Sequence, residues 1–336
     1  MNKELLSVKN LKMYYPIKGG FLGRTVNHVK AVDDISFTVR EGETVSLVGE
    51  SGCGKSTAGR AILHLEKPTA GEIIFDGVDL TTLGKKEMRK MRKKMQIIFQ
   101  DPYASINPRQ TVSQVLQEAL HIQNVVAPGD RKKRAIELLE TVGLASYQAD
   151  RFPHEFSGGQ RQRVGIARAL SLNPKLVICD EAVSALDVSI RAQILNLLKN
   201  LQRDFKLTYL FISHDLGVVR HISDRVIVMY LGRIMEVSDK HDLFETPRHP
   251  YTRALLSAIP VPMPGQKKER IMLEGDVPSA IDPPEGCRFH TRCPFAVERC
   301  RSEVPELRPV AGAGEGHLCA CHFFEEIFLS DTGNAV

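Results

Sequence analysis

A glycine-rich stretch at residues 49–57, "GESGCGKST", contains the residues whose chemistry is easiest to name. The spacing of Gly49, Gly54, Lys55 and Ser56 is typical of a phosphate-binding loop. Glycines let the backbone curl so that its N–H groups point inward, and the N-terminus of the following helix adds partial positive charge. Lys55 would reach the β- and γ-phosphates, and the Ser56 hydroxyl would ligate Mg²⁺. The strand before the loop and the helix after it argue against a chance glycine-rich turn.

Two carboxylates follow an apolar run at residues 176–181, "LVICDE". Such a run indicates a fully buried strand, with Asp180 and Glu181 at its C-terminal end. Asp180 suits the coordination shell of Mg²⁺, and Glu181 could polarise an attacking water as general base. Taken alone, a solvated acidic turn explains the pair better, but the phosphate-binding loop in the same chain favours catalysis.

A second candidate anion nest lies at residues 156–163, "FSGGQRQR". Ser157, Gly158 and Gly159 stand where a helix is expected to begin, so their backbone N–H groups could also face an anion. One nucleotide does not need two such nests. The sequence therefore favours a head-to-tail pair of subunits, in which this nest closes on the γ-phosphate held by the loop of the other chain. A flexible turn before an amphipathic helix is the alternative.

Five motifs in one order carry a family resemblance. The motifs "GESGCGKST", "IIFQDP", "FSGGQRQR", "LVICDEAVSALD" and "FISHD" extend over about 170 residues, and together they resemble the nucleotide-binding subunit of ATP-binding cassette (ABC) transporters. This resemblance implies an ATPase with an α/β P-loop NTPase fold. The cassette of this family has a RecA-like core, an N-terminal antiparallel β subdomain and a helical insertion.

The resemblance also implies roles for single residues. Gln100 resembles the Q-loop glutamine that senses the γ-phosphate and Mg²⁺ and faces the membrane partner. His214 resembles the switch histidine, and Asp187 closes a D-loop, "SALD", that crosses the dimer interface. Tyr15 is the expected stacking partner of adenine, and Tyr14 is a weaker candidate because it lies on the opposite face of a strand. The other residues expected to contact ATP are Glu50, Ser51, Gly52, Cys53, Thr57 and Gln160.

Simpler interpretations exist for several of these residues in isolation. Gln100 could be a surface glutamine and His214 a satisfied histidine at a strand end. Cys53 and Cys179 could be small buried residues without a function. Phe156 stands where the family's motif usually has leucine, and it preserves an apolar anchor.

The periodicity places these motifs on regular elements. Strands are expected at "LLSVKNLKMYY", "VDDISFTVR", "TVSLVGE" and "GEIIFDG", and the helix after the phosphate-binding loop should run until Pro68. Residues 101–170 have helical spacing and form the expected insertion. The segments "KLVICDE", "TYLFISHD" and "DRVIVMYLGRIMEV", with the helix "SIRAQILNLLKNLQRDF", indicate a mainly parallel sheet. We expect a cassette at residues 1–245 and an extension at 246–336.

Composition restricts the function only weakly. The chain has 336 residues with 43% hydrophobic content, enough for a sizeable core, and its net charge of +5 does not argue for nucleic acid or lipid binding. The basic run at residues 85–94 lacks interleaved aromatics, which favours a solvated helix face. No apolar run approaches ~18 residues, and the N-terminus lacks a signal-peptide core, so we expect a cytosolic chain.

The last 90 residues carry a second resemblance. "RHPYTRALLSAIP", "GCRFHTRCPFAVERC" and "HLCACH" resemble the extension of oligopeptide, dipeptide and nickel importer ATPases, and "YYPIKGG" resembles the second ATPase of such systems. The resemblance implies a peripheral subunit at the cytoplasmic face of the inner membrane that powers peptide import. Its partners would be a paralogous ATPase, two permease subunits and, indirectly, an extracytoplasmic solute-binding protein. Nickel or another small solute is the alternative cargo.

A soluble ABC protein that acts on ribosomes or DNA is the rival from another functional class. Such proteins usually have two cassettes or long coiled-coil arms, whereas this chain has one cassette and no sustained heptads. We therefore expect no nucleic-acid partner.

Five of the seven cysteines lie within 35 residues, which favours metal ligation over disulfides. The spacing of Cys287, Cys293 and Cys300 is too loose for a zinc ribbon, although zinc stays open. The family resemblance implies a 4Fe–4S cluster held by four thiolates, and the terminal "ACH" makes Cys321 the fourth ligand and Cys319 a spare. Its role would be to staple a loop-rich segment, because ATP hydrolysis needs no redox step.

Overall fold

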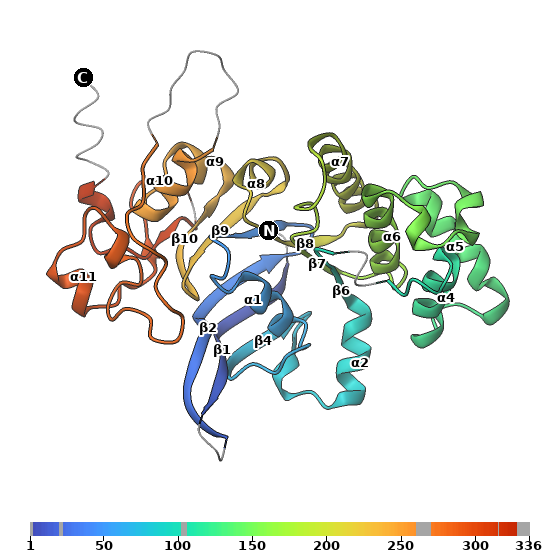
Figure 1. Ribbon diagram of the computed structural model, residues 1–336, viewed down its shortest axis with the longest axis horizontal. Helices are drawn as coiled ribbons and strands as arrows, with labels where there is room; N and C mark the ends of the chain where they lie inside the picture. The colour runs from blue at the N-terminus through green and yellow to red at the C-terminus, as the bar shows by residue number, and fades with distance from the viewer. Residues whose placement is uncertain (1–2, 20–22, 102–105, 260–269, 315, 328–336) are drawn as a thin grey trace, which may run out of the picture. The chain divides into compact units, whose positions relative to one another are not determined.

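The computed structural model describes residues 3–19, 23–101, 106–259, 270–314 and 316–327. The chain divides into two compact units, each assembled from separate stretches of sequence. The first unit comprises Met1–Leu5, Val39–Thr44 and Thr82–Ile212, and the second comprises Leu6–Thr38, Val45–Thr81 and Ser213–Val336. Both units contain helices and strands, which confirms the predicted α/β class (Figure 1).

Three parallel strands form the sheet of the first unit. They are β6 (Met95–Ile98), β7 (Leu176–Asp180) and β8 (Thr208–Ser213), in the order β8-β7-β6. Every residue of β7 is buried, as the apolar run predicted. Because the strands are parallel, their carboxyl ends meet at one edge, where the predicted site residues of this unit follow β6 and β7.

Helices make up the rest of the first unit. They are α2 (Lys85–Lys94), α4 (Val112–Ile122), α5 (Arg131–Thr141), α6 (Gly158–Leu170) and α7 (Val188–Phe205). Figure 1 shows α4, α5 and α6 as one group, and α5 contacts both others; all three lie in the segment for which a helical insertion was predicted. In α2 only Met88 and Met91 are buried, so its basic side chains lie on the solvated face, as expected.

The second unit begins with an antiparallel sheet. Its strands are β1 (Glu4–Gly19), β2 (Arg24–Arg40), β4 (Ala70–Phe75) and β5 (Val78–Asp79), in the order β2-β1-β4-β5. Strand β4 pairs antiparallel with both β1 and β5, which supports the predicted N-terminal subdomain. The register of β1 shifts between Lys9 and Lys12, where Asn10 has a φ of +47°.

A second sheet of this unit carries the phosphate-binding loop. Strand β3 (Thr44–Val48) runs parallel to β9 (Arg225–Tyr230), and β10 (Arg233–Asp239), β12 (Leu318–Cys319) and β11 (Arg308–Pro309) follow antiparallel. Its helices are α1 (Lys55–Ile62), α8 (Leu216–Ile222), α9 (Lys240–Glu245), α10 (Pro250–Ser257) and α11 (Glu298–Ser302).

Two predicted elements need correction. The run "DRVIVMYLGRIMEV" is not one strand but the hairpin β9–β10, because Leu231 and Gly232 both have positive φ and form a tight turn whose twist matches that of the strands. Helix α1 ends at Ile62 rather than continuing to Pro68. His64 has a φ of +52°, a left-handed conformation that a helix cannot continue through.

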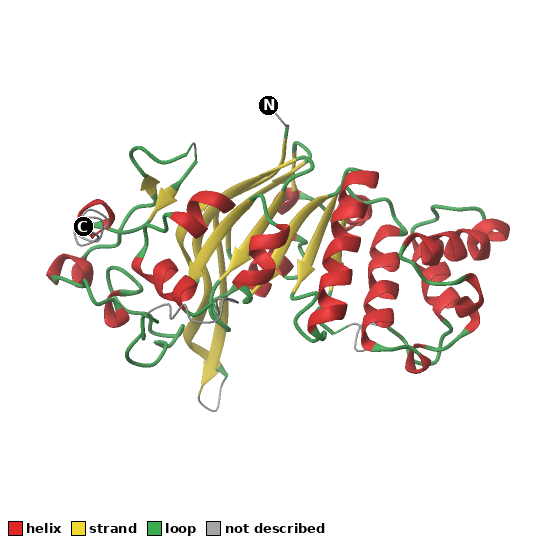
Figure 2. Ribbon diagram, turned by 90° about the horizontal axis from the view of Figure 1, so that it is seen from above, coloured by secondary structure: helices red, strands yellow, loops and turns green. Residues whose placement is uncertain are grey.

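The described residues after α10 form only one 3-10 turn, the short helix α11 and the two-residue strands β11 and β12, and loops make up the rest (Figure 2). This segment is nevertheless packed, because Cys287, Phe289 and Cys300 belong to the same buried cluster as Val48 of β3 and Tyr230 of β9. Short 3-10 turns complete the described elements at Leu80–Thr82, Pro128–Asp130, Ser146–Asp150, Pro153–Glu155 and His290–Arg292.

Candidate functional site

The phosphate-binding loop is curled as its glycines predicted. Gly49, Gly52 and Gly54 have φ values of +151°, +81° and +103°. A Cβ atom on Gly49 would collide with the backbone oxygen of Met229, and one on Gly54 with that of Ala31. Glycine is therefore required at these two positions both by conformation and by space.

Lys55 is the first residue of α1, and its side chain points back into the loop. The residue is 4% exposed, and its Nζ donates to the backbone oxygens of Gly49 and Glu50, each at 2.9 Å. Ser56 and Thr57 are half-buried in the first turn of the helix. The loop thus wraps around a buried cation at a helix N-terminus, an arrangement that suits a polyphosphate.

Contacts from the C-terminal extension hold Glu50 of this loop. The Tyr251 hydroxyl accepts a hydrogen bond from the Glu50 N–H at 3.0 Å, and Arg292 forms an ion pair with the Glu50 carboxylate at 2.9 Å. The sequence motifs did not single out Tyr251 or Arg292, because no local spacing links residues more than 200 positions apart. Burial raises the pKa of the neighbouring Cys53 thiol, which fits an inert residue in the loop.

Tyr14 and Tyr15 of β1 have different partners. The Tyr14 hydroxyl donates to Asp33, whereas the Tyr15 hydroxyl donates to Glu66. Burial and the bond to Asp33 raise the pKa of Tyr14 to about 12, so this hydroxyl is a permanent donor. Tyr14 is therefore engaged in an ionic network, and the stacking role of Tyr15 stays a prediction.

His214 directly follows β8 and is exposed. The next residue, Asp215, caps α8 by accepting hydrogen bonds from the N–H groups of Gly217 and Val218. His214 therefore lies between a strand end and a capped helix, and its role as a switch histidine stays a prediction.

In the first unit, Asp180 and Glu181 stand at the end of β7, as predicted. Asp180 is 5% exposed. Glu181 has a φ of +47°, and its N–H donates to the backbone oxygen of Ile212 at 3.0 Å. The Glu181 carboxylate accepts a hydrogen bond from Gln100 Nε2 at 2.9 Å. Two residues predicted from separate motifs thus meet at the carboxyl ends of neighbouring strands.

The serine-glycine nest begins α6, as predicted. The Ser157 hydroxyl accepts from the Gln160 N–H at 3.3 Å, and the Gln160 side chain accepts from the Ser157 N–H at 3.0 Å. This reciprocal capping box leaves Ser157 and Gly158 exposed, while Gly159 packs against Ile190 of α7. Phe156 is 3% exposed and forms the predicted apolar anchor.

A cavity of about 140 Å³ joins three predicted motifs in the first unit. It is lined by Gln100, by Gly158 and by Ala185 and Leu186 of the "SALD" motif. Asp187 is exposed, and its backbone oxygen accepts a bond from the Arg191 N–H at the start of α7. The joint action of these residues with Lys55 and Ser56, which belong to the second unit, stays a prediction.

Four cysteines line one small cavity near the C-terminus: Cys287, Cys293, Cys300 and Cys321, the four predicted ligands. Nearby backbone N–H groups, of Phe289 at Cys287, of Phe295 at Cys293 and of Phe323 at Cys321, favour the thiolate and partly oppose the effect of burial on the pKa. Burial raises the pKa of Cys293 to about 11 and that of Cys321 to about 12.

All seven cysteines are free thiols, so no disulfide competes with ligation. The predicted spare, Cys319, is fully buried in β12. Among the described residues, no three His, Cys, Asp or Glu side chains are grouped so that they could hold a metal ion. The cavity that these four cysteines line together with eight other residues is about 10 Å³, which is room for about one water molecule.

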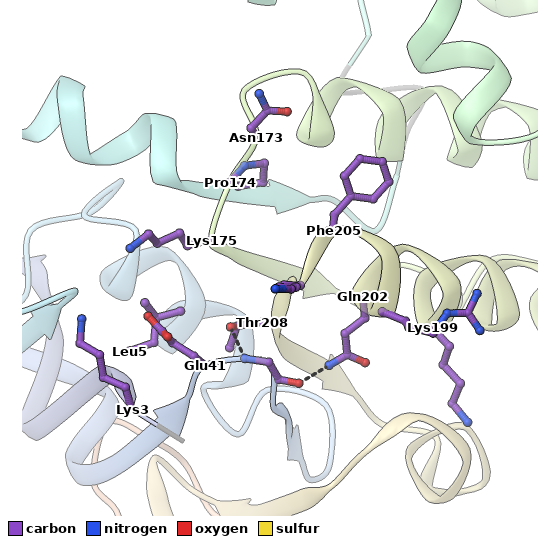
Figure 3. A pocket seen from close by; sticks show the side chains of 13 residues that line it. Lys3, Leu5, Glu41, Asn173, Pro174, Lys175, Lys199, Gln202, Phe205 and Thr208 are labelled. Carbon is purple, nitrogen blue, oxygen red and sulfur yellow. Dashed lines mark hydrogen bonds between the residues drawn. The ribbon is translucent and has the colours of Figure 1, made fainter. Parts of the chain in front are cut away.

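A different cavity, of about 800 Å³, lies in the first unit at the amino ends of β7 and β8 (Figure 3). Gln202 of α7 donates to the backbone oxygen of Gly42, and the Gly42 N–H donates to Thr208, as the dashed lines show. None of the predicted site residues lines it. Ligands of parallel sheets bind at the opposite, carboxyl ends, so this cavity is not the expected nucleotide site.

Within the described part of the chain, no helix has both the length and the apolar character needed to cross a membrane.

Comparisons with known proteins agree with the motifs. A family model described as "ABC transporter" matches residues 32–184, and one described as "Oligopeptide/dipeptide transporter, C-terminal region" matches residues 235–300. The oligopeptide transport ATP-binding protein AppF of Bacillus subtilis (strain 168) is 54% identical over 96% of this chain and 98% of its own length. A putative peptide import ATP-binding protein of Brucella ovis is 54% identical over 94% of this chain and 97% of its own.

The fold is similar to that of a solved cassette. The structure of the ATP-binding cassette MJ0796, dimeric, in a post-hydrolysis state and bound to ADP and Pi, aligns with a TM-score of 0.62 at 32% identity. The alignment covers 70% of this chain and 98% of that one. The chain therefore belongs to the family of ATP-binding subunits of oligopeptide/dipeptide ABC importers, and it has the P-loop NTPase fold of the ABC cassette.

Proposed function

We propose that this chain hydrolyses ATP in a site shared between two ATPase subunits, and that closure of this pair drives peptide import through a membrane permease. The observation that carries the proposal is that one chain has two loop-to-helix junctions at which we propose anion binding. One is curled around the buried Lys55, and the other is the exposed, capped start of α6 at Ser157. The peptide cargo is inferred from the relatives, which are named for peptide transport.

The contacts support a distinct role for each residue of the site. Lys55 and the loop N–H groups would neutralise the β- and γ-phosphates, and the partner subunit's serine-glycine nest would seal the γ-phosphate from the other side. Glu181 would orient the attacking water and accept its proton, and the bond from Gln100 to Glu181 holds that carboxylate in place. Mg²⁺, for which Ser56, Asp180 and Gln100 are the proposed ligands, would neutralise phosphate charge.

The proposed partners follow from the family. They are a paralogous ATPase, two permease subunits and an extracytoplasmic solute-binding protein, and the chain would act as a peripheral subunit at the cytoplasmic face of the inner membrane. Nickel import is the second candidate. Transport by the reconstituted complex, with a labelled dipeptide, a labelled oligopeptide and Ni²⁺ as competing cargoes, distinguishes the two.

The substitution Glu181→Gln tests the proposed site. It keeps the size of the side chain but removes its basicity, so ATP binding should persist while turnover falls by roughly 10²- to 10⁴-fold. The measurement is steady-state hydrolysis beside binding of a fluorescent ATP analogue, made on the complex purified with its permease. Glu245, which is exposed at the end of α9, provides the control as Glu245→Gln. Unchanged hydrolysis in the Glu181 variant would rule out a general base at this position.

We also propose that Cys287, Cys293, Cys300 and Cys321 hold a 4Fe–4S cluster, with zinc as the alternative. Two observations support the donor set: the four thiols line one cavity, and they are free. The cluster would staple a segment that has little regular structure.

Anaerobic purification followed by iron, sulfide and zinc analysis tests this proposal. The expected result is about four iron and four sulfide per chain, as the cluster's composition requires, with the iron lost in Cys321→Ser and retained in Cys319→Ser. One zinc per chain, or iron loss that is equal in the two variants, would contradict the assignment.

A further inference from the structure

The segment between two of the clustered cysteines, residues 287–293, carries two arginines that bind the nucleotide-binding part of the chain. Arg292 Nη1 lies 2.9 and 3.2 Å from the two carboxylate oxygens of Glu50. Arg288 Nη2 lies 2.6 Å from Asp33 Oδ2. Both arginine side chains are only 9% exposed, so these are not loose surface pairs.

Glu50 is a residue of the phosphate-binding loop, and three of its groups are engaged. Its carboxylate pairs with Arg292, its N–H donates to the Tyr251 hydroxyl, and its backbone oxygen accepts from Lys55 Nζ. The peptide groups on either side of Glu50 therefore connect the extension directly to the lysine that would bind phosphate. Rotation of this residue would displace one of the two carbonyls that hold Lys55.

The segment is rigidly seated where it makes these contacts. Phe289 is fully buried, and its ring lies 5.4 Å from the ring of Tyr230 and 5.3 Å from that of Tyr251. The Arg292 guanidinium lies 5.9 Å from the centre of the Tyr230 ring, a distance that allows a cation–π contact. The aromatic cluster thus fixes both Tyr251 and Arg292, the two groups that hold Glu50.

The second arginine acts on the strand that backs the loop. Asp33, which accepts from Arg288, lies on β2 two residues after Ala31, whose carbonyl leaves no space for a Cβ on Gly54. The N–H of Asp33 also donates to the Gly232 oxygen, and the Gly232 N–H donates to the Cys53 oxygen. The same short segment therefore restrains both sides of the loop.

We propose that Arg292 is a positioning residue for ATP binding, which holds Glu50 so that the phosphate-binding loop keeps Lys55 in place to receive a triphosphate. This inference deepens the proposed function, since it rests on ATP binding to this loop. The C-terminal extension then contributes to the free energy of ATP binding, although none of its residues needs to touch the nucleotide.

The test is nucleotide affinity of the full-length chain in its complex, measured with a fluorescent ATP analogue and Mg²⁺. Arg292→Met preserves the aliphatic stem and removes the charged hydrogen bonds, and it should weaken binding by about tenfold, as expected for a hydrogen bond to a charged group. Arg292→Lys keeps the charge without the planar fork, so it should restore part of the affinity. In hydrolysis assays, KM for ATP should rise more than kcat falls.

Arg299→Met is the matched control. Arg299 lies in the same extension and also pairs with a glutamate, but at 56% exposure, so its removal should change the affinity by less than about twofold. Glu50→Gln should weaken binding as Arg292→Met does, and the double variant should be no weaker than either single one, because both remove the same contact. Thermal midpoints show whether each variant is folded. If Arg292→Met does not fold, the ATP affinity of Arg292→Lys provides the test.

Any of three results would overturn this inference without affecting the proposed function. The first is wild-type ATP affinity in both Arg292→Met and Arg292→Lys, and the second is an equal loss of affinity in Arg292→Met and Arg299→Met. The third is a loss of affinity in the double variant that equals the sum of the losses in Glu50→Gln and Arg292→Met. A wild-type complex that binds no ATP would instead overturn the proposed function, and this inference with it.

Discussion

At the scale of single residues, the site depends on backbone conformations that most amino acids avoid. Glu181 has a φ of +47°, which is strained for a residue with a side chain, yet this conformation directs its N–H to Ile212 and its carboxylate to Gln100. In the phosphate-binding loop the same region of φ is occupied by glycines, for which it carries no steric cost.

Two glycines of this loop provide a matched pair of substitutions. Gly54→Ala adds a Cβ that collides with the Ala31 carbonyl, so the loop must shift, and we expect nucleotide binding to be lost. Gly52→Ala adds a Cβ that meets nothing within 4 Å, so only the conformational penalty of about 1–2 kcal/mol applies. Titration with a fluorescent ATP analogue measures both. Equal affinities in the two variants would show that the close approach to Ala31 is unimportant.

At the scale of elements, α4 and α6 begin with the same kind of capping box, but we propose a role in ATP hydrolysis only for the start of α6. Thr111 caps α4 through a reciprocal bond with Gln114, and Ser157 caps α6 through the same bond with Gln160. Capping explains why a serine or threonine stands at each start, so the capping box by itself carries no evidence of function.

The two caps can be separated by experiment. Ser157→Ala and Thr111→Ala should each reduce the free energy of unfolding by about 1 kcal/mol, because each removes one cap. Only Ser157→Ala should also slow ATP hydrolysis by the assembled complex, since only its helix faces the partner's nucleotide in the proposed arrangement. Thermal denaturation and steady-state hydrolysis provide the two measurements. A similar loss of hydrolysis in Thr111→Ala would remove the support for a special role of α6.

At the scale of the whole molecule, residues far apart in sequence share one compact unit. The second unit contains the phosphate-binding loop, the strand residues from Val45 that precede it and the extension from residue 246, and Asp33 is a point where they join. Asp33 is 7% exposed in its side chain and accepts hydrogen bonds from Tyr14, Arg233 and Arg288. Burial opposes its ionisation, but these three donors lower the pKa of Asp33 below its usual value.

Asp33→Asn should therefore destabilise the protein by about 3 kcal/mol at neutral pH, because two largely buried arginines lose their shared carboxylate. Since the pKa is lower in the folded state, the stabilisation is complete above the unfolded pKa of about 3.9 and is lost as the pH falls through the folded value. The difference in denaturation midpoint between wild type and variant should be constant from about pH 7 to pH 5 and shrink below about pH 4. Asp204→Asn, at an exposed ion pair, is the control. A difference that grows on acidification would contradict this account.

The sequence by itself determined the elements and motifs whose causes are local. Neighbouring residues determine the glycine loop through conformational preference, the buried strand that ends at Asp180 through hydrophobic periodicity, and the start of α6 through capping. The same local reasoning missed the turn at Leu231 and Gly232, because a leucine in the left-handed region is not a turn signal, and it extended α1 beyond Ile62.

Only the tertiary structure decided which distant residues meet. The bond from Gln100 to Glu181 follows from the parallel pairing of β6 with β7, and the gathering of four cysteines follows from the packing of the extension. The pairs Arg292–Glu50 and Arg288–Asp33 join residues more than 240 positions apart. Such contacts have no sequence signature, because the packing of the folded core decides which buried charges face each other, and a charge can be buried there only where it finds a partner.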